Sequence, residues 1–337
     1  MLYRKYRPQD FEEVVGQEHV VKTLQGALET GRVGQAYLFA GPRGTGKTTL
    51  ARIMAKAVNC VEYGKKGATV PCNKCPQCNA VNLGNSLDLI EIDAASNRGI
   101  DEIRNLKESA FTAAASGGRK VFLIDEVHML TKDAFNALLK ILEEPPSHIV
   151  FILATTEPHK ILPTVLSRVQ RFDFKRLTVE EITKKLKTIA KAEGIQIEET
   201  AVHAIAASAD GALRDAEVSL TKLRTVIPSG PISAEQVSHA LGLIPHTFHP
   251  QFLGYLLTGD KQQAIALIHN IHEAGMDLDH FAKDFLAHTR TTLISNFNSP
   301  DQAKLISIIL AFTTARTQIK TSPIPQLPLE LAVMQLL

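Results

Sequence analysis

A glycine-rich stretch, GPRGTGKT at residues 41–48, lies between an apolar run and a helical pattern. The run AYLFAG (36–41) predicts a short buried strand, and residues 48–59 repeat apolar side chains in steps of three and one, as one face of a helix does. A strand, a G-x-x-x-x-G-K-[ST] loop and a helix in this order form a phosphate-binding arrangement, in which backbone N–H groups wrap around phosphates. The stretch therefore predicts an α/β domain built around a P-loop.

Further apolar runs predict strands at 87–93, 120–126 and 148–156, and helical patterns at 99–115 and 131–144 lie between them. Strands that alternate with helices indicate a parallel sheet with helices on both faces.

After about residue 177 the sequence predicts helices only. Thr178 and Glu181 have the spacing of a capping box, and Gly194 suits the end of the same helix. Other helices are expected at 199–209, 212–226 and 233–242, and throughout the chain from 246 onward. We therefore expect an α/β domain over 1–177, a small helical domain over 178–242 and a helical C-terminal domain over 243–337.

The composition sets limits on function. The 337 residues suit two or three domains, 45% of them are hydrophobic, and the net charge is only +2. Binding to nucleic acid would therefore require a local arrangement of basic residues. The N-terminus has no apolar run, and no stretch of 18 apolar residues occurs, so we expect a cytoplasmic protein with no membrane contact and with reduced thiols.

The P-loop predicts specific contacts with ATP. Lys47 is expected to reach the β- and γ-phosphates, and Thr48 to hold Mg²⁺. The loop residues expected at the nucleotide are Gly41, Pro42, Arg43, Gly44, Thr45, Gly46, Lys47, Thr48 and Thr49. Asp125, which ends the strand at 120–126, is expected beside the magnesium, and Glu126 could activate water as a general base. A chance glycine-rich turn and a solvated strand end are the alternatives, and the pairing of the two motifs argues against both.

Three more polar residues have two interpretations each. Thr156, or its neighbour Thr155, follows an apolar run and could touch the γ-phosphate or the attacking water, or could simply end a strand. Arg168 in LSRVQRF and Arg214 in GALRDA could complement phosphate charge, although by pattern alone each is more typical of a solvated surface arginine.

All four cysteines of the chain lie in one short window, at Cys60, Cys72, Cys75 and Cys78. Four thiolates at this spacing in a reduced compartment favour tetrahedral Zn²⁺, with no position left open for water and hence a structural role. An iron–sulfur cluster is the competing metal site, and a redox pair would not need four cysteines. Loss of metal is expected to unfold the excursion at 60–78, within a zinc module at about 60–79, and to leave ATP binding largely intact.

Several segments together resemble one family. They are YRKYRPQDFEEVVGQEHV, QAYLFAGPRGTGKTT, DLIEIDAAS, VFLIDEVHMLTKDAFNALLKILEEPP, FILATTEPHKILPTVLSR and DGALRDA, and the similarity runs from about residue 3 to 242. These segments are similar to those of the bacterial clamp-loader ATPases, the gamma/tau subunits of DNA polymerase III in the AAA+ superfamily. The resemblance implies an AAA+ domain with an inserted zinc module, then a helical lid and a helical collar.

The resemblance also implies residue roles. Lys47 and Thr48 would form the Walker A pair, Asp125 and Glu126 the Walker B pair, and Thr156 would be sensor 1.

Two arginines gain roles in the same way. Arg168 would be an arginine finger that reaches the ATP of a neighbouring subunit, and Arg214 would be sensor 2, which reaches the ATP of its own chain. The family usually has Ser-Arg-Cys at the finger, whereas this chain has Ser167-Arg168-Val169. The valine changes packing and not charge. Further contacts with the nucleotide are implied for Tyr3, Pro8, Val14, Val15 and Leu213.

The implied function is an ATP-driven motor subunit that opens a sliding clamp and loads it onto primed DNA. Its partners would be other clamp-loader subunits and further copies of itself in a hetero-pentameric ring, the sliding clamp and primer–template DNA, and its cofactors ATP, Mg²⁺ and structural Zn²⁺. Candidate phosphate contacts of the DNA, at two helix N-termini, are Ser96, Asn97, Arg98, Thr131 and Lys132. Plain helix capping and solvated side chains are the alternative for these five. A non-hydrolysing scaffold subunit and a different AAA+ machine, such as a branch-migration motor, are the alternative functions.

Overall fold

The computed structural model describes residues 1–337 except 66, 229, 246, 296–299 and 337. The chain divides into two compact units, Met1–Pro228 and Ser229–Leu337.

The first unit contains a five-stranded parallel sheet. Its strands are β1 (Ala36–Ala40), β2 (Leu89–Asp93), β3 (Lys120–Asp125), β4 (Ile149–Thr155) and β5 (Gln170–Asp173), in the order β2-β3-β4-β1-β5. Every residue of β1 and β4 is buried, as parallel strands covered on both faces require. The parallel sheet predicted from sequence is confirmed. Strand β5 was not expected, because its QRFD sequence contains no apolar run.

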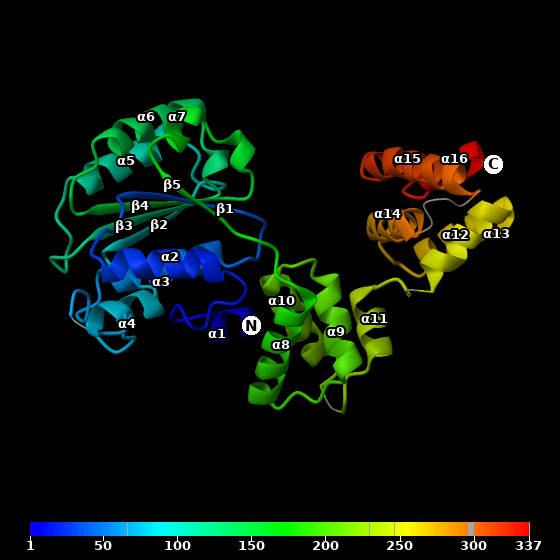
Figure 1. Ribbon diagram of the computed structural model, residues 1–337, viewed down its shortest axis with the longest axis horizontal. Coiled ribbons are helices and arrows are strands. Elements are labelled where there is room, and N and C mark those ends of the chain that lie inside the picture. Colours follow the sequence, from blue (N-terminus) through cyan, green and yellow to red (C-terminus); the bar gives the residue numbers. More distant parts are fainter. Residues whose placement is uncertain (66, 229, 246, 296–299, 337) are drawn as a thin grey trace. The chain divides into compact units, whose positions relative to one another are not determined.

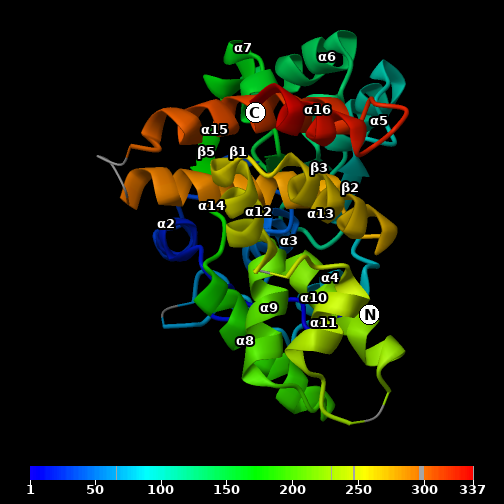
Figure 2. The ribbon, with the colours of Figure 1, turned by 90° about the vertical axis from the view of Figure 1, so that its right-hand side faces the viewer.

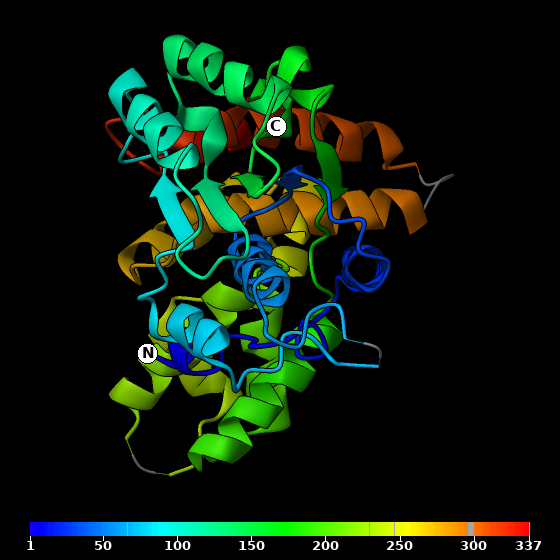
Figure 3. The same cartoon turned by 90° about the vertical axis from the view of Figure 1, so that its left-hand side faces the viewer.

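Helices cover both faces of the sheet (Figures 1 and 3). One face is covered by α2 (Glu18–Glu29) and α3 (Lys47–Val58), and the other by α5 (Ile100–Ala110), α6 (Lys132–Glu143) and α7 (Pro163–Leu166). The first unit also has α1 (Leu2–Lys5), α4 (Pro76–Leu83) and the 3₁₀ turns Val127–Met129 and Pro158–Lys160. Helix α5 ends at Ala110, five residues before the predicted end at 115. Helix α2 was not predicted, although its Val20, Leu24 and Leu28 are buried at a spacing of four.

Three more helices complete the first unit: α8 (Val179–Glu193), α9 (Glu199–Ser208) and α10 (Leu213–Val226). The predicted capping box is confirmed, since Glu181 N donates to Thr178 Oγ1 at 3.2 Å and Thr178 N donates to Glu181 Oε2 at 2.8 Å. Gly194 ends α8 with a left-handed φ of 65°.

The second unit is helical in its described residues. Its helices are α11 (Ala234–Leu241), α12 (Phe248–Thr258), α13 (Lys261–Glu273), α14 (Leu278–Ser295), α15 (Gln302–Ile319) and α16 (Leu327–Leu336). Helices α14, α15 and α16 pack side by side (Figure 2). The rings of Phe252 from α12, Phe285 from α14 and Phe312 from α15 meet edge to face in the core of this unit. No helix within the described residues combines the length and apolarity needed to cross a bilayer.

Candidate functional site

A cavity of about 530 Å³ lies beside the P-loop, at the carboxyl ends of β1 and β3, the two strands that flank β4 in the sheet. Ligands bind at this end of a parallel sheet as a rule. The predicted residues that line it are Tyr3, Pro8, Val14, Val15, Arg43, Gly44, Thr45, Gly46, Lys47, Thr48, Thr49, Asp125, Glu126, Leu213 and Arg214. The structure therefore brings together side chains from the N-terminus, the P-loop, the end of β3 and the start of α10.

Two glycines shape the loop. Gly46 precedes α3 with φ of 100°, and Gly44 has φ of 77°, both in the left-handed region that favours glycine. A Cβ on Gly44 would lie 2.9 Å from Cβ of Ala212, the residue that precedes α10. The P-loop therefore approaches the α10 end of the site closely enough to exclude any side chain at residue 44.

Lys47 lies inside the P-loop. Its Nζ donates to the carbonyl oxygens of Gly41 and Pro42, each at 2.8 Å. Burial lowers the pKa of Lys47, while the carboxylates of Glu126 and Asp125 act in the opposite direction. Gly41 and Pro42 thus contribute through the lysine, and they do not line the cavity itself.

Thr48 and Asp125 meet at the magnesium position predicted from sequence. Thr48 Oγ1 donates to Asp125 Oδ2 at 2.8 Å, which joins the first turn of α3 to the end of β3. Asp93 stands opposite Asp125 in the β2–β3 register and also lines the cavity. A hydroxyl and carboxylate oxygens are ligands that Mg²⁺ accepts, so the donor set fits this ion.

Glu126 is held from the neighbouring strand. Its φ of 49° is left-handed, and its Oε2 accepts hydrogen bonds from Thr156 Oγ1 at 2.9 Å and from Thr156 N at 3.2 Å. The ring of His128 lies on the same side, with Nδ1 3.0 Å from Thr155 Oγ1 and 3.4 Å from Glu126 Oε2. Thr156 therefore contacts the carboxylate of the proposed base, and it is not among the residues that line the cavity.

The two arginines lie in different surroundings. Arg214, in the first turn of α10, has its guanidinium carbon 4.9 Å from the centre of the Tyr3 ring at the cavity wall. Arg168 follows α7 and does not line the cavity; its Nη2 donates to Glu143 Oε1 at 2.8 Å, and its side chain is one-third exposed. The structure brings Arg214 to the site of its own chain and leaves Arg168 at the surface.

Sequence reasoning missed several residues of the cavity wall: Arg7, Asp93, Ala95, Leu177 and Glu217. Asp93 carried a usable signal, because it ends an apolar strand as Asp125 does. Nothing in the sequence indicated that Glu217 lies at the cavity, because it is one of several charged residues in α10, three residues after Arg214. Its side chain is buried, and burial raises its pKa to about 7.

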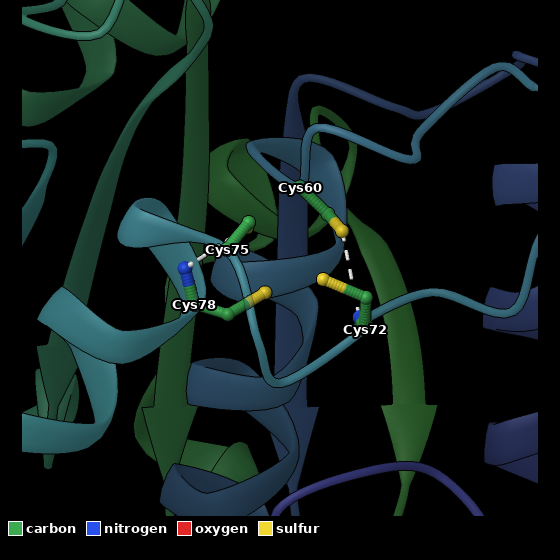
Figure 4. Close-up of side chains that lie close together, drawn as sticks. All are labelled: Cys60, Cys72, Cys75 and Cys78. Atoms are coloured by element: carbon green, nitrogen blue, oxygen red, sulfur yellow. Dashed lines mark hydrogen bonds between the residues drawn. The ribbon is translucent and has the colours of Figure 1, made fainter.

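The four cysteines converge within the first unit, in a segment that we call the cysteine module, residues 60–83. Their sulfur atoms all lie within 4.8 Å of one another, and Figure 4 shows the thiols of Cys60, Cys72 and Cys78 directed toward a common point. Zn–S bonds of about 2.3 Å in a tetrahedron place sulfurs roughly 3.8 Å apart, so the cluster fits Zn²⁺.

Backbone N–H groups surround these sulfurs. Cys72 N donates to Cys60 Sγ at 3.4 Å, and Cys78 N donates to Cys75 Sγ at 3.5 Å at the start of α4. Hydrogen bonds from the N–H groups of Lys74 and Cys75 lower the pKa of Cys72 to about 6, while burial raises that of Cys78. One thiolate is thus favoured even without a metal.

The residues proposed for DNA contact form two adjoining segments. Thr131 N donates to the carbonyl oxygen of Arg98 at 3.2 Å, which joins the two. Thr131 Oγ1 accepts from Ala134 N at 3.3 Å as the cap of α6, and Ser96 Oγ donates to Asp93 Oδ2 at 2.9 Å. The side-chain amide of Asn97 donates to the carbonyl oxygen of Asp93. These local bonds agree with helix capping, and Lys132 is exposed at the start of α6.

Two family descriptions match the chain. Residues 16–178 match "DNA polymerase III, delta subunit", and residues 181–222 match "DNA polymerase III clamp loader subunit, ATPase lid domain". The DNA polymerase III subunit tau of Bacillus subtilis is 45% identical over 87% of this chain and 51% of its own length. That of Escherichia coli is 42% identical over 85% of this chain and 44% of its own length. The chain thus spans about half the length of these relatives.

Solved structures support the same fold. One of them is the RuvB Holliday junction branch migration motor of Thermotoga maritima, with a TM-score of 0.53 and 24% sequence identity. The match covers 75% of this chain and 79% of the RuvB chain. This likeness concerns the AAA+ fold alone. From the matched families and relatives, the chain belongs to the gamma/tau family of DNA polymerase III clamp-loader subunits.

Proposed function

We propose that this chain is an ATP-hydrolysing motor subunit that helps to open a sliding clamp and load it onto primed DNA. The observation that carries the proposal is the hydrogen bond between Thr48 and Asp125 beside Glu126, in the P-loop cavity of a clamp-loader family member. A scaffold subunit that does not hydrolyse ATP would not need this set. This chain has all four residues of the set, and they lie together at the cavity wall: Lys47, Thr48, Asp125 and Glu126.

The chemistry follows from the positions of these side chains. Lys47 offsets phosphate charge, and Thr48 and Asp125 would hold Mg²⁺, which supplies charge stabilisation at the transferring phosphoryl group. Glu126 accepts a proton from the attacking water. Thr156 donates hydrogen bonds to one oxygen of this carboxylate, Oε2. No described residue donates to the other oxygen, Oε1, which leaves it for the water.

The remaining assignments are part of the same proposal. Arg168 acts as a finger toward a neighbouring subunit, an assignment that its exposure and its absence from the cavity lining of its own chain support, whereas Arg214 acts on the nucleotide of its own chain as sensor 2. The cysteine module holds structural Zn²⁺. The domain divisions at about 177 and 242 stay predictions, as do the cytoplasmic location and the subunit, clamp and DNA partners.

The DNA contacts also belong to the proposal. Ser96, Asn97, Arg98, Thr131 and Lys132 would meet the phosphate backbone of the primer–template without reading its sequence. The joining of the two segments through Thr131 N and the Arg98 carbonyl supports a shared surface.

The test is ATP turnover by the chain assembled with candidate clamp-loader subunits, with and without sliding clamp and primer–template DNA together. We expect strong stimulation by the pair, and loss of turnover with Glu126→Gln although nucleotide still binds. Lys47→Ala should abolish binding or turnover. A rate that clamp and DNA leave unchanged would contradict the clamp-loading role.

A further inference from the structure

Lys56 is a buried lysine that connects three parts of the first unit. It lies in the last turn of α3 and is only 2% exposed. Its Nζ donates to Asn73 Oδ1 and to Asn82 Oδ1 at 2.8 Å each, and also to the backbone oxygen and the Oε1 of Gln9. A buried ammonium is costly unless its N–H groups find acceptors, so all of these oxygens contribute to keeping Lys56 in place.

Two of the acceptors belong to the cysteine module. Asn73 lies between Cys72 and Cys75 and has a left-handed φ of 55°. Asn82 is on α4, one turn after Cys78. A metal held by these cysteines would therefore fix the positions of both amide oxygens that face Lys56.

The other two acceptor oxygens belong to Gln9, in the segment 7–15, which we call the N-terminal strap. Gln9 follows Pro8, and the strap also contributes Val14 and Val15 to the wall of the nucleotide cavity. The strap is tied internally, because Gln9 N donates to Glu13 Oε2 at 2.7 Å. Displacement of Gln9 would therefore move its neighbour Pro8, and through Glu13 the region of Val14.

We propose that Lys56 is a positioning residue that makes nucleotide affinity depend on the metal in the cysteine module. A metal bound by the four cysteines would fix the segments that carry Asn73 and Asn82. Their amide oxygens hold the ammonium of Lys56, and Lys56 holds the strap at the wall of the nucleotide cavity. This inference rests on the nucleotide binding proposed above. It differs from the expectation, drawn from the sequence, that loss of metal leaves ATP binding largely intact, and the experiment below decides between the two.

Lys56 is placed to change affinity more than turnover. It does not line the nucleotide cavity, and within the described part of the chain no hydrogen bond joins it to Lys47 or to Glu126. Residues that carry the chemistry would stay in place when the strap moves. A change in the strap should therefore appear as weaker binding, with kcat at saturating nucleotide largely preserved.

The experiment measures the affinity of a fluorescent ATP analogue, with Mg²⁺ constant, for the zinc-loaded protein and for protein stripped by a chelator that spares Mg²⁺. Bound zinc is assayed in each sample. We expect stripping to weaken binding by about tenfold, the size of effect typical for the loss of hydrogen bonds to a charged group. Lys56→Met with zinc bound should show the same weakening, and stripping it should add little, because the two changes break one chain of contacts.

A matched control is Lys120→Met. Lys120 is also buried, and its Nζ donates to Thr112 Oγ1 and Ser109 O, away from the cavity and the cysteine module. This variant should lose stability and keep the full zinc dependence of binding. If Lys56→Met does not fold, Asn73→Gly combined with Asn82→Ala removes the two acceptors of the module and keeps the lysine. Glycine suits the left-handed conformation of residue 73.

The outcomes separate the two proposals. Wild-type protein that binds no nucleotide would overturn the proposed function. Wild-type protein that binds equally well with and without zinc would overturn this inference alone. This inference would also be overturned if Lys56→Met, or the double asparagine variant, bound nucleotide as tightly as wild type and lost as much affinity when zinc was removed.

Discussion

Thr156 contacts Glu126 through two hydrogen bonds to one carboxylate oxygen, from its hydroxyl at 2.9 Å and its backbone N–H at 3.2 Å. The first residue after β4 thus fixes the residue that follows β3. In the proposed function, this contact lets Thr156 act on turnover through Glu126, although Thr156 does not line the cavity.

Thr156→Val removes the hydroxyl bond and retains the shape of the side chain and the backbone bond. We expect turnover to fall by about tenfold or more, because a mispositioned base loses part of its contribution, while nucleotide affinity stays within about twofold. Steady-state turnover and equilibrium binding are the measurements. Thr156→Ser keeps the hydroxyl and should retain most activity; a loss in binding equal to the loss in turnover would contradict this role.

Arg168→Ala should preserve nucleotide affinity and reduce the hydrolysis of the assembled complex by about a hundredfold or more, as expected for a finger supplied by a neighbour. The control is Glu143→Gln, which breaks the ion pair of Arg168 in its own chain and leaves the guanidinium with its hydrogen bonds to Thr164 O and Ser167 Oγ. That variant should keep hydrolysis, since an exposed pair contributes little to stability. Weakened binding with unchanged hydrolysis in Arg168→Ala would argue against a finger.

Gly44→Ala should abolish or strongly weaken nucleotide binding. The φ of 77° disfavours alanine, and its Cβ would lie 2.9 Å from the Cβ of Ala212, so the P-loop and the start of α10 would have to separate. The matched control is Gly26→Ala in α2, where nothing lies within 4 Å of the added Cβ. That variant should bind normally and gain roughly 0.5–1 kcal/mol of stability from helix propensity. Normal binding by Gly44→Ala would show that the loop tolerates the shift.

Glu217 makes stability depend on pH. Because burial raises its pKa from 4.5 to about 7, the folded protein keeps a proton that the unfolded chain loses, and stability falls as pH rises from about 4.5 to 7. The loss amounts to about 3 kcal/mol at most and is constant at higher pH. Glu217→Gln removes this charge, so the Tm of the nucleotide-free variant should exceed that of wild type at pH 8 and match it near pH 4.5. If the difference in Tm between Glu217→Gln and wild type were the same at pH 8 and at pH 4.5, the raised pKa of Glu217 would be contradicted.

Several features could be predicted from sequence because they are local. The P-loop needs a strand, a glycine loop and a helix in direct succession, and Asp125 lies at the end of its own apolar strand. The convergence of the cysteine thiols also follows from sequence, since three of them are three residues apart and metal ligation suits that spacing.

Tertiary structure decided the rest. The sequence pattern made no prediction for Lys56, which is buried in α3 because oxygens from residues 9, 73 and 82 surround it. Glu217 lines the cavity because α10 packs against α1 at the N-terminus of the chain, and β5 pairs with β1 despite its polar sequence. Sequence periodicity reports which face of an element is apolar. It cannot report which distant segments supply the acceptors and the walls, because those depend on how the chain packs.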